Sequence, residues 1–118
     1  MKTQLQDIAP YRTRDGSQIR ELMHPGQQPV RNQSLAEAVV QPGEQTQLHR
    51  HVASEELYHV TVGMGTMTLG TEQFAIAQGD TVLIPAGTAH CVAARGAEPL
   101  HILCCCSPAY SHDDTELL

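Results

Sequence analysis

The feature that most constrains the fold of this chain is a regular succession of short apolar or alternating runs, each ended by glycine or proline. The runs lie at 35–41, 45–51, 56–62, 66–69, 73–77, 81–84, 90–94 and 100–106. No segment shows the sustained 3.6-residue periodicity of an amphipathic helix. Short strands separated by turn residues are typical of antiparallel barrels and sandwiches, so the sequence predicts an all-β protein.

The domain organisation follows from length and texture. A chain of 118 residues is long enough for one hydrophobic core and too short for two. Residues 35–106 are predicted to form the barrel, and the polar residues 1–34 an extension that packs on the barrel or on a partner subunit. Within this extension Asp15-Gly16 predicts a hairpin turn. Residues 107–118 are expected to be a C-terminal tail, either one capped helical turn or a frayed end.

Charge and hydropathy exclude several classes of partner. The chain carries a net charge of −6 and a single lysine, Lys2, so it has no broad basic surface for nucleic acid. No stretch approaches the roughly 20 apolar residues that cross a bilayer, and residues 1–10 lack the apolar centre of a secretory signal. We therefore expect a cytoplasmic protein with neither a membrane nor a nucleic-acid partner. Aromatic residues make up only 3% of the chain, which predicts an aliphatic core.

Four cysteines are present, and three of them are contiguous. Cys91 stands alone, while Cys104, Cys105 and Cys106 follow one another and cannot form a framework of separated disulfides. On a strand, Cys104 and Cys106 would share one face. We interpret the three contiguous cysteines as small buried hydrophobes of a cytosolic protein, because the spaced pairs that thiolate zinc sites use are missing.

The residues that carry chemistry are histidines and one glutamate. His49 and His51 are two residues apart, so both side chains leave the same face of a strand. Glu56 opens the next strand, and a hairpin return brings it back beside the pair. His90 begins a later strand. Three imidazoles and one carboxylate that converge inside a barrel predict a site for one divalent transition metal, namely Fe, Mn, Ni, Co, Cu or Zn.

The spacing of these residues resembles the two motifs of the cupin superfamily. The first motif is matched by Gly43, His49, His51, Glu56 and Gly63. The second is matched by Gly79, Pro85, Gly87 and His90. Ala94 stands where the family has asparagine, a position that does not ligate the metal. The 15-residue spacer between the motifs is like that of small single-domain bacterial cupins.

The resemblance implies an RmlC-like fold, an antiparallel double-stranded β-helix or jelly roll. It also implies either a metal-dependent enzyme (a dioxygenase, isomerase, lyase or decarboxylase) or a non-catalytic module that binds or senses a small ligand. A third reading is a purely structural metal. A homodimer is the expected assembly.

Alternation from the ligands predicts what surrounds the metal. Gln47, Val60 and Val92 are expected to face inward and contact substrate, and Tyr58 is the candidate catalytic acid–base group. His59 is expected to face outward. On the last long strand, either Ile102, Cys104 and Cys106 or His101, Leu103 and Cys105 face inward. With Glu56 as the only charged ligand, a divalent metal leaves a net charge of +1 and two open octahedral positions, which suits a small organic anion.

Overall fold

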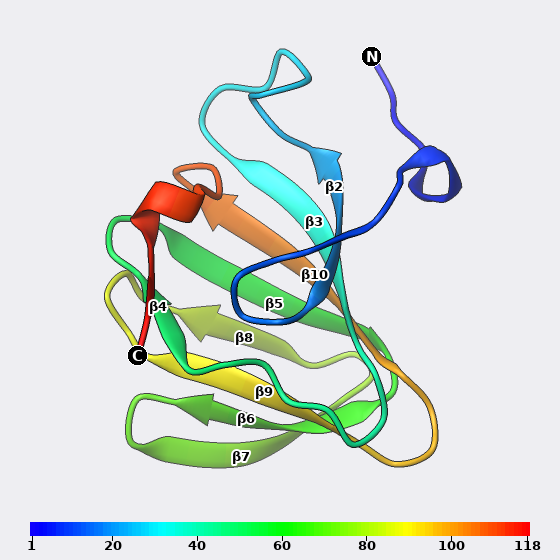
Figure 1. Ribbon diagram of the computed structural model, residues 1–118, viewed down its shortest axis with the longest axis vertical. Helices are drawn as coiled ribbons and strands as arrows, with labels where there is room; N and C mark the ends of the chain where they lie inside the picture. The colour runs from blue at the N-terminus through cyan, green and yellow to red at the C-terminus, as the bar shows by residue number, and fades with distance from the viewer.

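The fold, in this computed structural model of residues 1–118, consists of two antiparallel sheets that face each other (Figure 1). The first sheet has the order β1 (Tyr11–Arg12), β2 (Gln18–Met23), β3 (Ser34–Val40), β10 (Leu100–Ser107), β5 (Glu55–Val62) and β8 (Thr81–Ile84). The second has the order β11 (Thr115–Leu117), β4 (His49–His51), β9 (His90–Arg95), β6 (Met64–Leu69) and β7 (Glu72–Ala77). Two short 3₁₀ turns, η1 (Leu5–Asp7) and η2 (His112–Asp114), complete the chain. The predicted all-β jelly roll is confirmed.

One predicted strand is shorter than the sequence suggested. Within 45–51 only β4 is a strand, and Gln45 forms an isolated bridge with Ala93. Thr46 is turned inward, because its backbone N–H donates to Val92 O and its hydroxyl accepts from Val92 N. Alternation is therefore broken before His49, and positions counted backwards from that residue change face.

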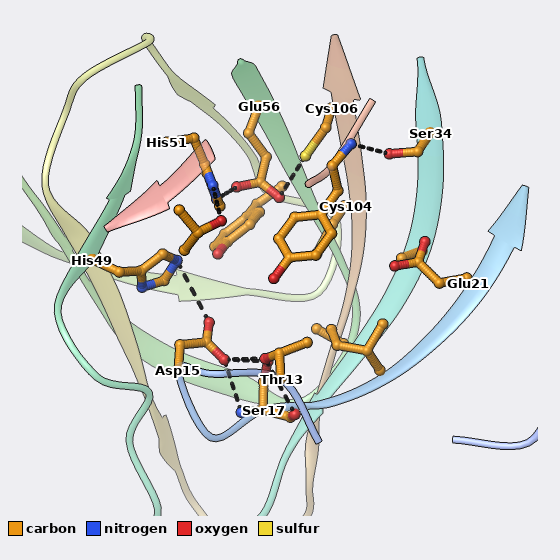
Figure 2. A pocket seen from close by; sticks show the side chains of 16 residues that line it. Thr13, Asp15, Ser17, Glu21, Ser34, His49, His51, Glu56, Cys104 and Cys106 are labelled. Carbon is orange, nitrogen blue, oxygen red and sulfur yellow. Dashed lines mark hydrogen bonds and ion pairs between the residues drawn. The ribbon is translucent and has the colours of Figure 1, made fainter. Parts of the chain in front are cut away.

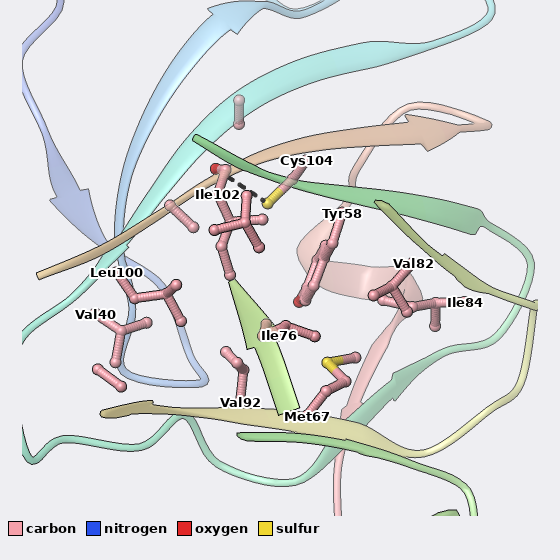
Figure 3. Close-up of a cluster of buried hydrophobic side chains, with 14 of the residues drawn as sticks. Val40, Tyr58, Met67, Ile76, Val82, Ile84, Val92, Leu100, Ile102 and Cys104 are labelled. Atoms are coloured by element: carbon pink, nitrogen blue, oxygen red, sulfur yellow. Dashed lines mark hydrogen bonds between the residues drawn. The ribbon is translucent and has the colours of Figure 1, made fainter. Parts of the chain in front are cut away.

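The core lies between the two sheets and is aliphatic, as the composition predicted (Figure 3). Its most deeply buried side chains come from facing strands: Val60, Met67, Ile84, Val92, Leu100 and Ile102. Burial of this apolar surface is the main force that holds the sheets together, at about 25 cal/mol per Å². Tyr58 is the only aromatic residue in the buried cluster, and it also lines a cavity. The core therefore forms one wall of that cavity.

The turn that ends β5 requires a glycine, Gly63. It separates β5 from β6 with a φ of +86°, a conformation that side chains with a Cβ rarely adopt. A Cβ at this position would lie 2.6 Å from the carbonyl oxygen of Pro99. The turn thus needs both the backbone freedom and the empty space that glycine provides.

Both terminal segments join the sheets. The predicted hairpin is present, with Tyr11 paired to Ile19 and Gly16 at a φ of +93°. In the first sheet β2 pairs with β3, and in the second sheet the edge strand β11 pairs with β4. The C-terminal residues are an ordered turn and strand rather than a frayed end. The division at residues 34 and 107 stays a prediction. No helix in the structure has the length and apolar character needed to cross a membrane.

Candidate metal centre

Three histidines from two neighbouring strands form a buried cluster (Figure 2 shows two of them). His49 and His51 lie on β4, and His90 begins β9, where it pairs directly with His49. One ring nitrogen from each histidine lies within 4.8 Å of the others, so the three could hold a metal ion. Their residues are only 2%, 5% and 0% exposed, respectively. The convergence predicted from the His-x-His spacing is present.

The orientation of two rings is set by backbone carbonyls. His49 Nδ1 donates to Gln47 O at 2.7 Å, and His90 Nδ1 donates to Thr88 O at 2.9 Å. A carbonyl oxygen can only accept, so Nδ1 carries the proton in both rings. Each Nε2 is then left with a lone pair directed into the cluster.

His51 is held by a residue from the C-terminal strand. Its Nδ1 lies 3.1 Å from Thr115 Oγ1, whose hydroxyl donates to Ser111 O at 2.9 Å. Because the hydroxyl proton is used in that bond, Oγ1 accepts from Nδ1. When the rings are neutral, all three Nε2 atoms are therefore unprotonated and face the cluster.

Glu56 adds a carboxylate to the cluster. Its Oε1 lies 3.2 Å from His51 Nε2 and 3.6 Å from His90 Nε2. Burial would raise the pKa of Glu56, but hydrogen bonds from the His51 and His90 rings, and their charge when protonated, outweigh burial and lower the pKa to about 2. Cys106 Sγ donates to Oε2 at 3.2 Å, which holds the carboxylate in place.

Two of the facing atoms have no hydrogen-bond partner although they are buried. These are Glu56 Oε1 and His90 Nε2. Leaving buried polar atoms unpaired costs free energy, about 1–3 kcal/mol each, unless another group satisfies them. A set of lone pairs that point at one another is satisfied by a cation, so these residues fit a metal.

A cavity of about 500 Å³, including its open mouth, adjoins the cluster. It is lined by Glu56, His49 and His51, and also by Asp15, Glu21 and Tyr58 among others. Neither lysine nor arginine lines it. Figure 2 shows Asp15 and Glu21 on the side of the cavity formed by the N-terminal hairpin.

Two phenols lie beside the cluster, Tyr58 and Tyr110, and the Tyr110 ring is 5.7 Å from that of His51. Tyr58 is the one that the sequence predicted. It is buried in β5 and its ring packs edge-on against His90, with centroids 5.9 Å apart. Burial, reinforced by the negative charge of Glu56, raises the pKa of Tyr58 well above its usual value. The phenol is therefore a neutral proton donor at physiological pH.

The three residues predicted to contact substrate do not line the cavity. Gln47 is exposed and does not line the cavity, because residues before β4 leave the strand alternation; only its carbonyl serves the site. Val60 and Val92 belong to the core and not to the cavity wall. His59 faces outward and bonds Thr81 Oγ1.

On β10 the first of the two predicted alternatives holds. Cys104 and Cys106 line the cavity, and Ile102 is buried in the core. Burial, followed by the charge of Glu56, raises the pKa values of both thiols. These two cysteines are therefore neutral, and all four cysteines are free.

Sequence reasoning missed the residues that the terminal segments bring to the site. Asp15, Tyr110 and Thr115 line the cavity, and none was proposed as a site residue. The hairpin signal at Asp15 was visible, but no local pattern shows which barrel strand a hairpin tip will contact. Thr115 had no signal, since its role depends on the long-range pairing of β11 with β4.

Comparison with known proteins adds the family. A cupin domain model matches residues 36–106. The chain is a cupin. An uncharacterized protein of Methanocaldococcus jannaschii is 51% identical over 118 residues, which is 100% of this chain and 94% of that protein. Protein SchB of Streptomyces halstedii is 33% identical over 84 residues, 71% of this chain and 60% of that protein.

Among solved structures, the cupin resembles Lactobacillus farciminis oxalate decarboxylase in complex with formate. The TM-score is 0.82 at 26% identity, over 96% of this chain. This cupin spans 34% of that longer chain, so the activity of the decarboxylase belongs to a larger protein.

Proposed function

We propose that this cupin is an enzyme that depends on one divalent transition metal and acts on a small organic anion. His49, His51, Glu56 and His90 would hold the metal. The observation that carries the proposal is the buried cluster of three histidine ring nitrogens, together with Glu56 Oε1 and His90 Nε2, which have no hydrogen-bond partner.

The donor set favours certain metals. Imidazole nitrogen with one carboxylate oxygen suits Mn, Fe, Co, Ni, Cu or Zn, and does not suit Ca²⁺ or Mg²⁺, which prefer oxygen. When bound, such an ion supplies positive charge that polarises a coordinated oxygen. The residues of the chain contribute the rest: Gln47 O, Thr88 O and Thr115 Oγ1 fix the rings, and Cys106 fixes the carboxylate.

The charge of the cavity supports an anionic substrate bound directly to the metal. Because no lysine or arginine lines the cavity, the metal would supply its fixed positive charge. A divalent ion with the Glu56 carboxylate leaves a net charge of +1 at the metal itself, which attracts a coordinating carboxylate group. The carboxylates of Asp15 and Glu21 line the same cavity and oppose this attraction, so the anion would have to bind the metal directly.

Acid–base groups in the cavity favour catalysis by proton transfer over simple ligand storage. Tyr58 is a neutral donor beside His90, and the carboxylates Asp15 and Glu21 line the same cavity. Isomerases, lyases and decarboxylases use such groups. We therefore favour these reactions over a dioxygenase reaction, and the experiment below also measures oxygen uptake to test for the latter.

The test is to screen the metal-loaded protein against small hydroxy and keto acids, with product analysis and an oxygen electrode in parallel. We expect turnover without oxygen consumption, reduced at least about 100-fold in Tyr58→Phe. Oxygen uptake coupled to turnover would identify a dioxygenase instead. Tight binding of these acids with no turnover would identify a non-catalytic binding module.

We also propose a homodimer, supported by an apolar row on the outer face of the first sheet. Leu35, Cys105, Leu57 and Leu83 lie opposite one another on β3, β10, β5 and β8. The three leucines are at least 37% exposed. A second copy of the chain would cover this row. Sedimentation at micromolar concentration tests the proposed dimer, and a monomer would contradict it.

We further propose a cytoplasmic location, which the four free cysteines support.

A further inference from the structure

The tip of the N-terminal hairpin places a second carboxylate at the histidine cluster (Figure 2). Asp15 Oδ2 lies 3.5 Å from His49 Nε2, and the side chain is 13% exposed. The other oxygen, Oδ1, accepts hydrogen bonds from the Thr13 hydroxyl, from Ser17 N at 2.9 Å and from Ser17 Oγ at 2.7 Å. These bonds fix the carboxylate and leave Oδ2 without a hydrogen-bond donor from the protein.

The hairpin is attached to the segment that orients His49. The carbonyl of Asp15 accepts from Gln47 N at 2.8 Å, and the carbonyl of Gln47 accepts from His49 Nδ1 at 2.7 Å. Asp15 and His49 are thus connected through one residue. The position of Oδ2 is set by the fold rather than by a free side-chain rotation.

Asp15 and Glu56 approach different parts of the cluster. Glu56 Oε1 is near His51 and His90, whereas Asp15 Oδ2 is near His49. Both carboxylates line the cavity, Glu56 among the buried rings and Asp15 beside Thr13 and Ser17. A molecule that enters the cavity and reaches the metal centre would therefore meet Oδ2.

We propose that Asp15 selects the substrate by accepting a hydrogen bond from a hydroxyl group of the substrate. This inference rests on the proposed function and narrows it: the substrate is a monoanion that carries a hydroxyl beside its carboxylate, a 2-hydroxy acid. Asp15 would repel a dianion, since a second carboxylate would face Oδ2 with no proton between them. A hydrogen bond to a charged acceptor is among the stronger ones.

The substitution Asp15→Asn tests this cleanly. The amide oxygen can still accept from Thr13 and Ser17, so the turn is preserved, while an NH₂ group replaces Oδ2. The probes are glycolate and methoxyacetate, which share a carboxylate and an adjacent oxygen and differ in the hydroxyl proton. Both are titrated calorimetrically into the Mn²⁺-loaded wild-type protein and variant. The steric effect of the extra methyl is present in both proteins and cancels in the comparison.

We expect Asp15→Asn to weaken glycolate binding at least about tenfold and to leave methoxyacetate unweakened. Mn²⁺ affinity, measured by chelator competition, should change less than about threefold, because the proposal has Asp15 contact the substrate and not the metal. The matched control is Glu21→Gln, which removes the same charge from the same cavity away from His49 and should affect both probes equally.

Three results would overturn the inference. Equal changes for the two probes in Asp15→Asn, whether gains from the lost negative charge or losses, would show that Asp15 does not recognise the hydroxyl proton. Loss of Mn²⁺ would make it a metal ligand. A wild-type protein that binds Mn²⁺ but neither probe would exclude the substrate class. Failure of the wild-type protein to take up any of the proposed metals would instead show that the proposed function itself is wrong.

Discussion

The site is built from two regions that differ in how they reach it. The barrel strands β4, β5 and β9 supply the histidines and Glu56 from positions buried between the sheets. The terminal segments supply Asp15, Tyr110 and Thr115 from outside residues 36–106, the range matched by the cupin domain. The barrel provides the histidines and the glutamate of the family motifs, which could hold a metal. The terminal segments provide site residues that lie outside those motifs.

The two terminal segments are physically connected to each other. Arg14 Nη1 lies 3.3 Å from the carbonyl oxygens of both His112 and Thr115, which joins the hairpin to the C-terminal strand. His24 bonds Tyr110 O at 2.8 Å. The terminal segments therefore form one cap, defined by residues 11–24 and 110–117. We expect the barrel to determine whether a metal binds and the cap to tune how tightly and with what ligand.

The largest expected effect concerns the barrel ligands. His49→Ala or His90→Ala should abolish stoichiometric metal binding, because each removes one nitrogen from the cluster. His59→Ala is the control, since His59 faces outward and bonds Thr81. Inductively coupled plasma mass spectrometry of the three purified variants measures the outcome. Equal loss in the His59 variant would invalidate the assignment of faces on β5.

Thr115 tests whether the cap tunes the metal. Thr115→Val keeps the shape of the side chain but removes the acceptor of His51 Nδ1, so metal affinity should fall about 10- to 100-fold. Thr115→Ser retains the hydroxyl and should stay close to wild type. Competition with a chromophoric chelator gives both affinities. An unchanged affinity in the valine variant would restrict the site to the barrel.

Acid should lower the free energy of unfolding of the metal-free protein, and the group responsible is His49 in the barrel. Burial, followed by the nearby His90, lowers the pKa of His49 below 6.5. The unfolded state therefore binds more protons as the pH falls below about 6.5, and the free energy of unfolding should fall with it. Urea midpoints at pH 8 and pH 5.5 measure the change, and His49→Gln should reduce the slope. A midpoint that rises on acidification would contradict the sign.

The smallest effect is expected from the link between the two halves of the cap. Arg14→Ala removes two long hydrogen bonds to carbonyls at the surface, so it should lower the free energy of unfolding by less than about 1 kcal/mol. Metal affinity should fall only a few-fold. Arg95→Ala, in the second sheet and bonded to Thr66, serves as control. A larger loss of metal in the Arg14 variant would show that the cap holds the ligands rather than tunes them.

What the sequence could predict follows the same division. The His-x-His spacing, Glu56 and His90 were visible because strand alternation and glycine-bounded turns act locally. The prediction that the Gln47 side chain faces inward was wrong, because Thr46 turns inward and ends the strand alternation. This is a tertiary effect that has no local signal in the sequence. Asp15 and Thr115 could not be assigned, since their roles arise when segments far apart in sequence pack together, as in the Gln47–Asp15 bond and the pairing of β11 with β4.

The central claim is that the buried lone pairs of three histidines and Glu56 hold one metal ion. The most direct measurement is the metal content of the purified protein, both as isolated and after equilibration with Mn²⁺, Fe²⁺, Co²⁺, Ni²⁺, Cu²⁺ or Zn²⁺ and removal of excess. We predict one ion per chain for at least one of these metals, lost in His90→Ala. A wild-type protein with no stoichiometric metal under any of these conditions would contradict the account.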